Sequence, residues 1–303
     1  MKSLAFARRG LAAANGPGAE AECDRNGQWP DIAVHWRQIG PPLRPSAQDI
    51  NFCLDAVLGW FRNQGAPPRV LLLGVTPELY HLPWPEGTDF LAVDRTPEMI
   101  DCVWPGPKGR VLCIDWRSMM LPEHSRDIVL CDGGLHLLAY PEEQRRLARL
   151  LKGIVSDRGL CIFRLYVPPP CREYPESVLM DLMDGRISSL NILKLRLGMS
   201  LSNSTAEGVE LDAVWRALHD TAPDWGRLAS RLGWPLEHIM AINTYRGSKA
   251  RYYFSTLDQA SDLFCAGQGG FEICRVRLPT YDLGDRCPTM VLRRLPRTAR
   301  AQT

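Results

Sequence analysis

Short apolar runs, separated by polar turns and helical segments, fill the sequence between residues 69 and 166. They are residues 69–74, 89–94, 110–115, 126–132 and 159–166. Runs of this length that are apolar on both sides are typical of strands in a buried parallel sheet. The pattern therefore predicts an α/β fold, and ligands of such sheets bind beyond the carboxyl ends of the strands.

Helical spacing precedes and separates these runs. Ser46 followed by Asp49 resembles a helix N-cap, and apolar residues then recur at helical spacing up to residue 61. The proline-rich segment before this helix is either a lid over the site or a plain connector. Short helices should begin at Pro77 and Pro97, because proline at the first helical position leaves no amide unsatisfied. Residues 141–152 have a leucine side and a charged side, which predicts a surface helix.

The pattern changes beyond the three prolines at residues 168–170. Helical spacing then continues for about a hundred residues, and two strand-like runs close the chain as a terminal hairpin. The helical block is therefore expected to be an insertion after the fifth strand, about residues 170–268, within one domain over residues 31–303. Residues 1–30 are expected to be disordered or loosely held. The predicted helices of the block are residues 177–197, 211–218, 225–232 and 256–265.

The composition excludes several classes of partner. The 303 residues are 45% hydrophobic and 23% charged, and 36 basic against 34 acidic residues leave a net charge of only +2. This balance creates no general attraction to nucleic acid or to an anionic membrane. No apolar run approaches the roughly 20 residues that a membrane-spanning helix needs. We therefore expect a soluble protein without a nucleic-acid or membrane partner.

The ten cysteines are scattered singly, with no Cys-x-x-Cys pair and no histidine pair at metal-ligand spacing. They predict no metal site. Most of them lie inside apolar runs, which fits a reducing compartment better than a disulfide framework. The expected location is the cytoplasm, and the sequence leaves the oligomeric state open.

Acidic residues end three of the predicted strands. Asp94, Asp115 and Asp132 close the second, third and fourth runs, so the carboxyl edge of the sheet is expected to hold one polar ligand. Asp94 stands about twenty residues after Gly74, where a carboxylate can accept both hydroxyl protons of a ribose. Asp115 can accept a hydrogen bond from the amino group of adenine, and Trp116 can cover the base.

Other interpretations of these acids remain. A strand-end aspartate can simply cap the following helix or turn. A nicotinamide dinucleotide would also use Gly74 and Asp94, but it needs a Gly-x-Gly-x-x-Gly turn with free amides, and Pro77 removes one of them. Asp115 can accept a hydrogen bond from adenine, whereas a carboxylate has no favourable contact with the phosphates of a dinucleotide. The three acids together favour an adenosyl cofactor.

The order of the Gly74 loop, Asp94, Asp115–Trp116, Asp132 and the helix and strand that follow resembles the class I S-adenosylmethionine-dependent methyltransferases. The resemblance covers about two-thirds of the chain. It implies a Rossmann-like, seven-stranded, mostly parallel sheet with an antiparallel last strand, formed here by residues 289–295. It also implies S-adenosyl-L-methionine as the cofactor. The expected activity is O- or N-methylation of a small-molecule acceptor, for example in specialised metabolism.

The first loop departs from that family, which usually has two or three glycines after an acidic residue. Here Gly74 is the only glycine, and Val75, Thr76, Pro77 and Glu78 follow it. Thr76 can offer its hydroxyl, and Glu78 can hold the ammonium group of the cofactor. The same departure supports a second hypothesis, in which a degenerate methyltransferase fold serves as a binding or partner-assembly module.

Candidate acceptor residues come from the later part of the chain. His136 follows the fourth strand, and its ordinary pKa suits a general base, although a histidine packed at the start of a helix is an equal alternative. Tyr166, the second candidate catalytic residue, shares a strand face with Arg164, so both can face a polar acceptor or support the site from behind. Tyr245 and Arg246 lie in a segment of cations and aromatics, which is typical of recognition of an anionic or aromatic acceptor.

Overall fold

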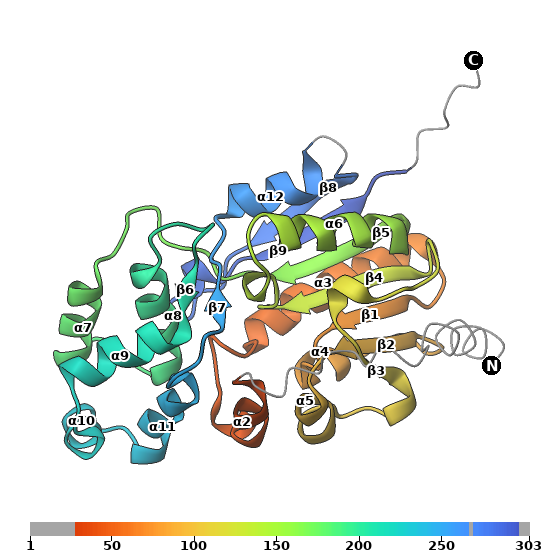
Figure 1. Cartoon of the computed structure of the whole chain (residues 1–303). Coiled ribbons are helices and arrows are strands. Elements are labelled where there is room, and N and C mark those ends of the chain that lie inside the picture. Colours follow the sequence, from red (N-terminus) through yellow and green to blue (C-terminus); the bar gives the residue numbers. More distant parts are fainter. Residues whose placement is uncertain (1–27, 267–268, 297–303) are drawn as a thin grey trace, which may run out of the picture.

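A seven-stranded sheet organises the protein, in the order β3-β2-β1-β4-β5-β9-β8 (Figure 1). The computed structural model describes residues 28–266 and 269–296, so most of the predicted loose segment, residues 1–30, lies outside the described residues. Six strands run parallel, and β9 runs antiparallel between β5 and β8. The predicted fold class is therefore confirmed. The strands are β1 (Arg69–Leu73), β2 (Asp89–Asp94), β3 (Val111–Cys113), β4 (Arg126–Asp132), β5 (Val155–Arg164), β8 (Phe271–Arg277) and β9 (Thr289–Arg294).

Helices cover both faces of the sheet because the strands are apolar on both sides. Along β1, Val70 and Leu72 belong to one core, and Leu71 and Leu73 belong to the other. The first core lies under α2 (Trp29–Val34), α3 (Ala47–Gln64), α4 (Pro77–Tyr80) and α5 (Pro97–Cys102). The second lies under α6 (Glu142–Ile154) and α12 (Leu257–Cys265). The predicted capping box is present at the start of α3, between Ser46 and Asp49.

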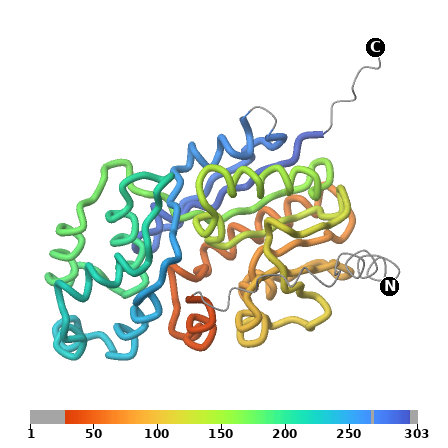
Figure 2. The backbone as a smooth tube through the Cα atoms, viewed as in Figure 1, coloured from red at the N-terminus to blue at the C-terminus, as the bar shows by residue number. Residues whose placement is uncertain are grey.

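The segment after β5 forms a group of helices beside the sheet (Figure 1). These are α7 (Pro175–Met183), α8 (Leu190–Leu201), α9 (Leu211–Thr221), α10 (Trp225–Leu232) and α11 (Leu236–Met240), with the short strands β6 (Val209–Glu210) and β7 (Arg251–Tyr252). Their buried side chains form a third core. The chain leaves the sheet after β5 and returns to it before α12 (Figure 2). The insertion is thus held to the sheet at two places.

Two details differ from the predicted boundaries. The predicted helix over residues 177–197 is two helices, since Gly185 adopts a positive φ of 72° after α7 and Ser189 caps the start of α8. The predicted extent of the insertion, about residues 170–268, includes α12, but α12 packs on α6 and β8. In the part of the chain that the structure describes, no helix combines the length and the apolar character of a membrane span.

Candidate functional site

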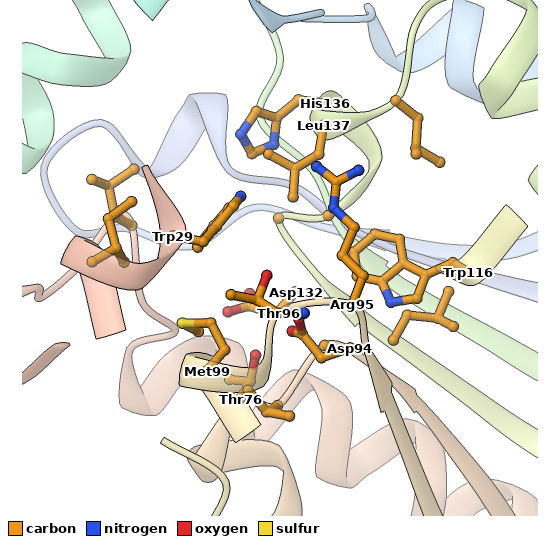
Figure 3. Close-up of a pocket in the computed structure, with 18 of the residues that line it drawn as sticks. Trp29, Thr76, Asp94, Arg95, Thr96, Met99, Trp116, Asp132, His136 and Leu137 are labelled. Atoms are coloured by element: carbon orange, nitrogen blue, oxygen red, sulfur yellow. The ribbon is translucent and has the colours of Figure 1, made fainter. Parts of the chain in front are cut away.

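A cavity lies beyond the carboxyl ends of the central strands, where parallel sheets bind ligands. In Figure 3, Thr76, Asp94 and Asp132 stand on one side of it, and Trp29 and His136 stand across from them. Nine of the twelve residues predicted for the site line this cavity: Gly74, Thr76, Asp94, Asp115, Trp116, Asp132, His136, Tyr166 and Tyr245. The structure does not bring Glu78, Arg164 or Arg246 to it.

The turn after β1 depends on its single glycine. Gly74 has a positive φ of 95°, and its amide donates to the carbonyl of Val93 at 2.8 Å. A side chain is strained in this backbone conformation, so glycine is the residue that the turn requires. Val75 is buried in the core, whereas Thr76 is buried at the cavity. The turn therefore presents a glycine backbone and one hydroxyl to a ligand.

Glu78 lies behind this turn, which differs from its predicted contact with a cofactor. Its carboxylate is paired with Arg44, whose Nε donates to Glu78 Oε1 at 2.8 Å. Arg44 also donates to the carbonyls of Trp36 and Ile39, both at 3.3 Å. This ion pair fixes the proline-rich segment, whose Ile39 lines the cavity. Glu78 thus shapes the wall of the site through Arg44.

Asp94 has two contacts of different kinds. Its Oδ1 accepts the amide hydrogen of Thr96 at 2.8 Å, as a capping aspartate does, and the side chain also lines the cavity. Burial raises the pKa of Asp94 to about 6, although hydrogen bonds from Thr96 act in the opposite direction. Asp94 therefore caps the turn at Thr96, and its place at the cavity leaves its predicted contact with a ligand open.

Asp115 and Trp116 form the wall of the cavity near β3. Asp115 Oδ1 accepts from the amide of Arg117 at 2.7 Å and from its Nε at 2.8 Å, so it caps the 3-10 helix η3 (Trp116–Ser118). Burial alone would raise the pKa of Asp115, but the hydrogen bonds from Arg117 hold it below its usual value. Trp116 Nε1 donates to the carbonyl of Val93 at 2.8 Å. That bond fixes the indole beside the Gly74 turn.

Gly134 keeps space open for the Trp116 ring. A Cβ atom at this position would stand 2.7 Å from the indole and 2.6 Å from Cys131 Sγ, and its backbone has an ordinary negative φ. We expect Gly134→Ala to shift the indole and to cost about 1 to 3 kcal/mol in the free energy of unfolding, because well-packed sites resist added volume. Urea denaturation followed by tryptophan fluorescence measures both effects.

Gly153→Ala in α6 is the matched control, since a Cβ there would meet no atom within 4 Å. It should stabilise the protein by up to about 1 kcal/mol, because alanine is the better helix former. If Gly134→Ala has the stability and the emission spectrum of the wild type, the absence of a Cβ at Gly134 is not what makes room for the indole of Trp116.

A buried network joins the ends of β4 and β5. Asp132 is paired with Arg164, whose side chain is 2% exposed. Arg164 also donates to the carbonyl of Pro42 at 2.6 Å and to the hydroxyl of Tyr166 at 3.1 Å. The Tyr166 hydroxyl lies 3.1 Å from the carbonyls of Pro42 and Leu43. Arg164 thus anchors the proline-rich segment to the sheet instead of facing an acceptor.

His136 belongs to an aromatic wall. Its ring stacks on Phe254 with centroids 5.7 Å apart and meets the rings of Tyr252 and Tyr166 edge-on, at 4.4 and 5.0 Å. Burial lowers the pKa of His136 to about 3, which differs from the ordinary value on which its predicted role rested. The pKa of Tyr166 is raised well above its usual value by burial. Both groups are therefore neutral at pH 7 and are poorly suited to proton transfer there.

The insertion contributes a cation that the sequence analysis did not identify. Lys194 of α8 lines the cavity together with Tyr245 and Tyr252. Its signal in the sequence is a lysine at the centre of an apolar helical run, to which the helix prediction over residues 177–197 gave no role. Arg246, which was predicted instead, packs over the ring of Trp215 at 5.1 Å, outside the cavity. Trp29, Trp36 and Arg95 also line the cavity and were not predicted.

Comparisons with known proteins found similar folds among solved structures. No protein-family model and no curated protein matches the sequence significantly. A structure from Rhodobacter sphaeroides, provisionally described as a Zn-dependent alcohol dehydrogenase, is 13% identical, covers 89% of this chain and 99% of its own, and has a TM-score of 0.55. The CcbJ methyltransferase from Streptomyces caelestis is 14% identical, with coverage of 89% and 99% and a TM-score of 0.49.

A third match is the 1,6-didemethyltoxoflavin-N1-methyltransferase from Burkholderia thailandensis, 12% identical, with coverage of 88% of this chain and 86% of its own and a TM-score of 0.48. The deciding observation is the strand order with β9 antiparallel between β5 and β8. The fold is that of the class I methyltransferases. In this methyltransferase fold, the cavity lies at the sheet edge that the resemblance assigns to the cofactor.

Proposed function

We propose that the protein is an S-adenosylmethionine-dependent methyltransferase that acts on a small-molecule acceptor through O- or N-methylation. The observation that carries the proposal is the convergence of Asp94, Asp115–Trp116 and the Gly74 turn on one cavity. These residues come from three neighbouring strands, β1 to β3. One polar ligand with an adenosyl group could contact all of these residues at once.

The residues present fit the adenosyl part of this cofactor. Asp94 would accept the ribose hydroxyls, and the fixed indole of Trp116 would cover the adenine. Asp115 would accept from the adenine amino group, because a carboxylate has about four lone-pair sites and Arg117 does not use all of them. Gly74 and Thr76 would lie beside the methionine part. When bound, the cofactor would supply an electrophilic methyl group.

The contribution of the protein to methyl transfer would be positioning and exclusion of water. His136 and Tyr252 would form an aromatic wall on the acceptor side, with Phe254 stacked on His136, and Tyr166 stays protonated beside them. Asp132 is held by Arg164, so it would orient the end of β4 rather than bind a ligand directly. This arrangement favours an acceptor that needs no strong base from the wall.

The first test is calorimetric titration with S-adenosylhomocysteine, with NADH as the control ligand. We expect micromolar binding of S-adenosylhomocysteine and none of NADH. Asp94→Ala should weaken the affinity at least about tenfold, since a hydrogen bond to a charged group contributes about 1.5 to 3 kcal/mol. Asp101→Ala is the matched control on α5, because Asp101 is exposed and is paired with Lys108. Its affinity should equal that of the wild type.

The other outcomes have defined meanings. Binding of NADH alone would replace the proposal with a dinucleotide enzyme. Binding of neither ligand would leave the degenerate fold that serves as a binding or partner-assembly module, which the single glycine of the Gly74 turn and the pairing of Glu78 with Arg44 both support.

A further inference from the structure

Lys194 is a buried cation in the cavity wall that the insertion supplies. Its residue surface is 8% exposed, and it lines the same cavity as Asp94 and Trp116. The ammonium group donates to the carbonyl of Ala241 at 3.1 Å and lies 4.6 Å from the ring centroid of Tyr245. Within residues 28–266 and 269–296, it forms no ion pair with a carboxylate.

This environment is costly for a charge. A buried ammonium group normally has an acidic partner, because one carbonyl and one ring face do not replace its hydration. Burial lowers the pKa of Lys194 to about 8, so the group still carries a proton at pH 7 for most of the time. An anionic ligand group in the cavity would supply the missing partner.

The groups around Lys194 indicate the shape of that ligand. Tyr245, Tyr252 and His136 line the cavity on the side of the insertion, and Trp29 stands on the same side of the cavity as His136 (Figure 3). A cluster of aromatic side chains at one end of the cavity suits a ligand with a flat aromatic ring. Among the described residues, two other cations line the cavity, Arg95 and Arg117, and both have Asp115 as a partner, at 3.6 Å for Arg95. Lys194 is thus the cation that is placed to meet an incoming anion on the acceptor side.

We propose that Lys194 binds the carboxylate of a planar aromatic acceptor. The inference rests on the proposed methyltransferase function and narrows its acceptor to aromatic carboxylic acids. The ammonium would form a charge-assisted hydrogen bond with the carboxylate, and the aromatic side chains beside it, among them Tyr245 and Trp29, would pack on the ring of the acceptor.

The test compares a charged probe with its neutral isostere. Binding of 4-fluorobenzoate and 4-fluorobenzamide is measured by fluorine NMR line broadening, with the free protein and with the protein saturated with S-adenosylhomocysteine. We expect the wild type to bind the benzoate at least tenfold more tightly than the benzamide. Lys194→Met should bind both probes equally, because it keeps the length of the side chain and removes the charge. Equal binding of the two probes by the wild type, or no binding of either, would overturn the proposal.

Two further variants make this result specific. Lys249→Met removes an exposed lysine that is paired with Glu210, and it should keep the tenfold preference. Lys194→Gln replaces Lys194→Met if the methionine variant does not fold, and it too should lose the preference. A preference that persists in the folded Lys194 variant would assign the anion site to another residue and overturn the proposal.

The carboxylate of the cofactor is the other anion that could pair with Lys194. Titration with S-adenosylhomocysteine and with 5′-methylthioadenosine, which lacks the amino-acid part, separates the two sources. We expect Lys194→Met to bind both nucleosides within about twofold of the wild type. Weaker binding of S-adenosylhomocysteine alone would assign Lys194 to the cofactor. Absence of S-adenosylhomocysteine binding by the wild type contradicts the proposed function, whereas an absent benzoate preference contradicts only this inference.

Discussion

Replacing Arg164 with methionine is expected to destabilise the protein by about 3 to 5 kcal/mol, because the carboxylate of Asp132 then remains buried without its partner. Both side chains are almost fully buried, at 2% and 6% exposure. The variant also loses the bonds from Arg164 to the carbonyl of Pro42 and to the hydroxyl of Tyr166. Urea denaturation at pH 7 gives the difference in the free energy of unfolding.

Two companion variants test the cause of this loss. Arg145→Met removes an arginine from an exposed pair with Glu142, and it should cost at most about 1 kcal/mol. The double variant Arg164→Met and Asp132→Leu should recover part of the stability, since it removes the unpaired charge as well. A double variant no more stable than Arg164→Met would show that packing around Arg164, and not the unpaired carboxylate, sets the loss.

The strands of the sheet could be predicted because each one is visible as a short apolar run in its own stretch of sequence. Each predicted run in the first half coincides with a strand to within a few residues, and the run over residues 289–295 is the antiparallel strand β9. A strand that is buried on both sides must be apolar along its length, whatever the rest of the fold does. The acids at the strand ends follow from the same pattern, so Asp94, Asp115 and Asp132 were identified as neighbours.

The contact partners of the site side chains lie far away in the sequence, and the sequence did not predict these contacts. Arg164 ends β5 and Tyr166 lies two residues beyond it, and the two side chains do meet. The carbonyl of Pro42, with which both form hydrogen bonds, lies more than a hundred residues earlier in the chain. Glu78 is paired with Arg44 for a similar reason. Lys194 reaches the cavity because the insertion lies beside the sheet and contributes to the cavity wall. No periodicity in the sequence encodes that approach.

Replacing Asp94 with asparagine is expected to stabilise the free protein at pH 7 by about 1 to 3 kcal/mol while it weakens S-adenosylhomocysteine binding. The pKa of Asp94 in the folded protein is raised to about 6, whereas an unfolded aspartate has a pKa near 4. The folded state therefore holds this proton more tightly, and stability falls as pH rises from about 4 to 6. Above that range the buried charge costs up to about 3 kcal/mol. Asparagine keeps an acceptor for the amide of Thr96 and carries no charge.

Urea denaturation of both proteins at pH 7 and at pH 4 tests the sign of this effect. The advantage of Asp94→Asn should be present at pH 7 and should be nearly lost at pH 4, where the wild-type carboxyl is protonated in the folded state and about half protonated in the unfolded state. Saturating S-adenosylhomocysteine should reduce the advantage at pH 7 by about 1.4 kcal/mol for each tenfold loss of affinity, because a ligand stabilises most the protein that binds it more tightly. A carboxylate retained only as a cap would give the opposite result, with Asp94→Asn no more stable than the wild type at pH 7. If the Asp94 carboxylate lowers the stability of the free protein and raises it only in the presence of S-adenosylhomocysteine, its role is to bind the ligand.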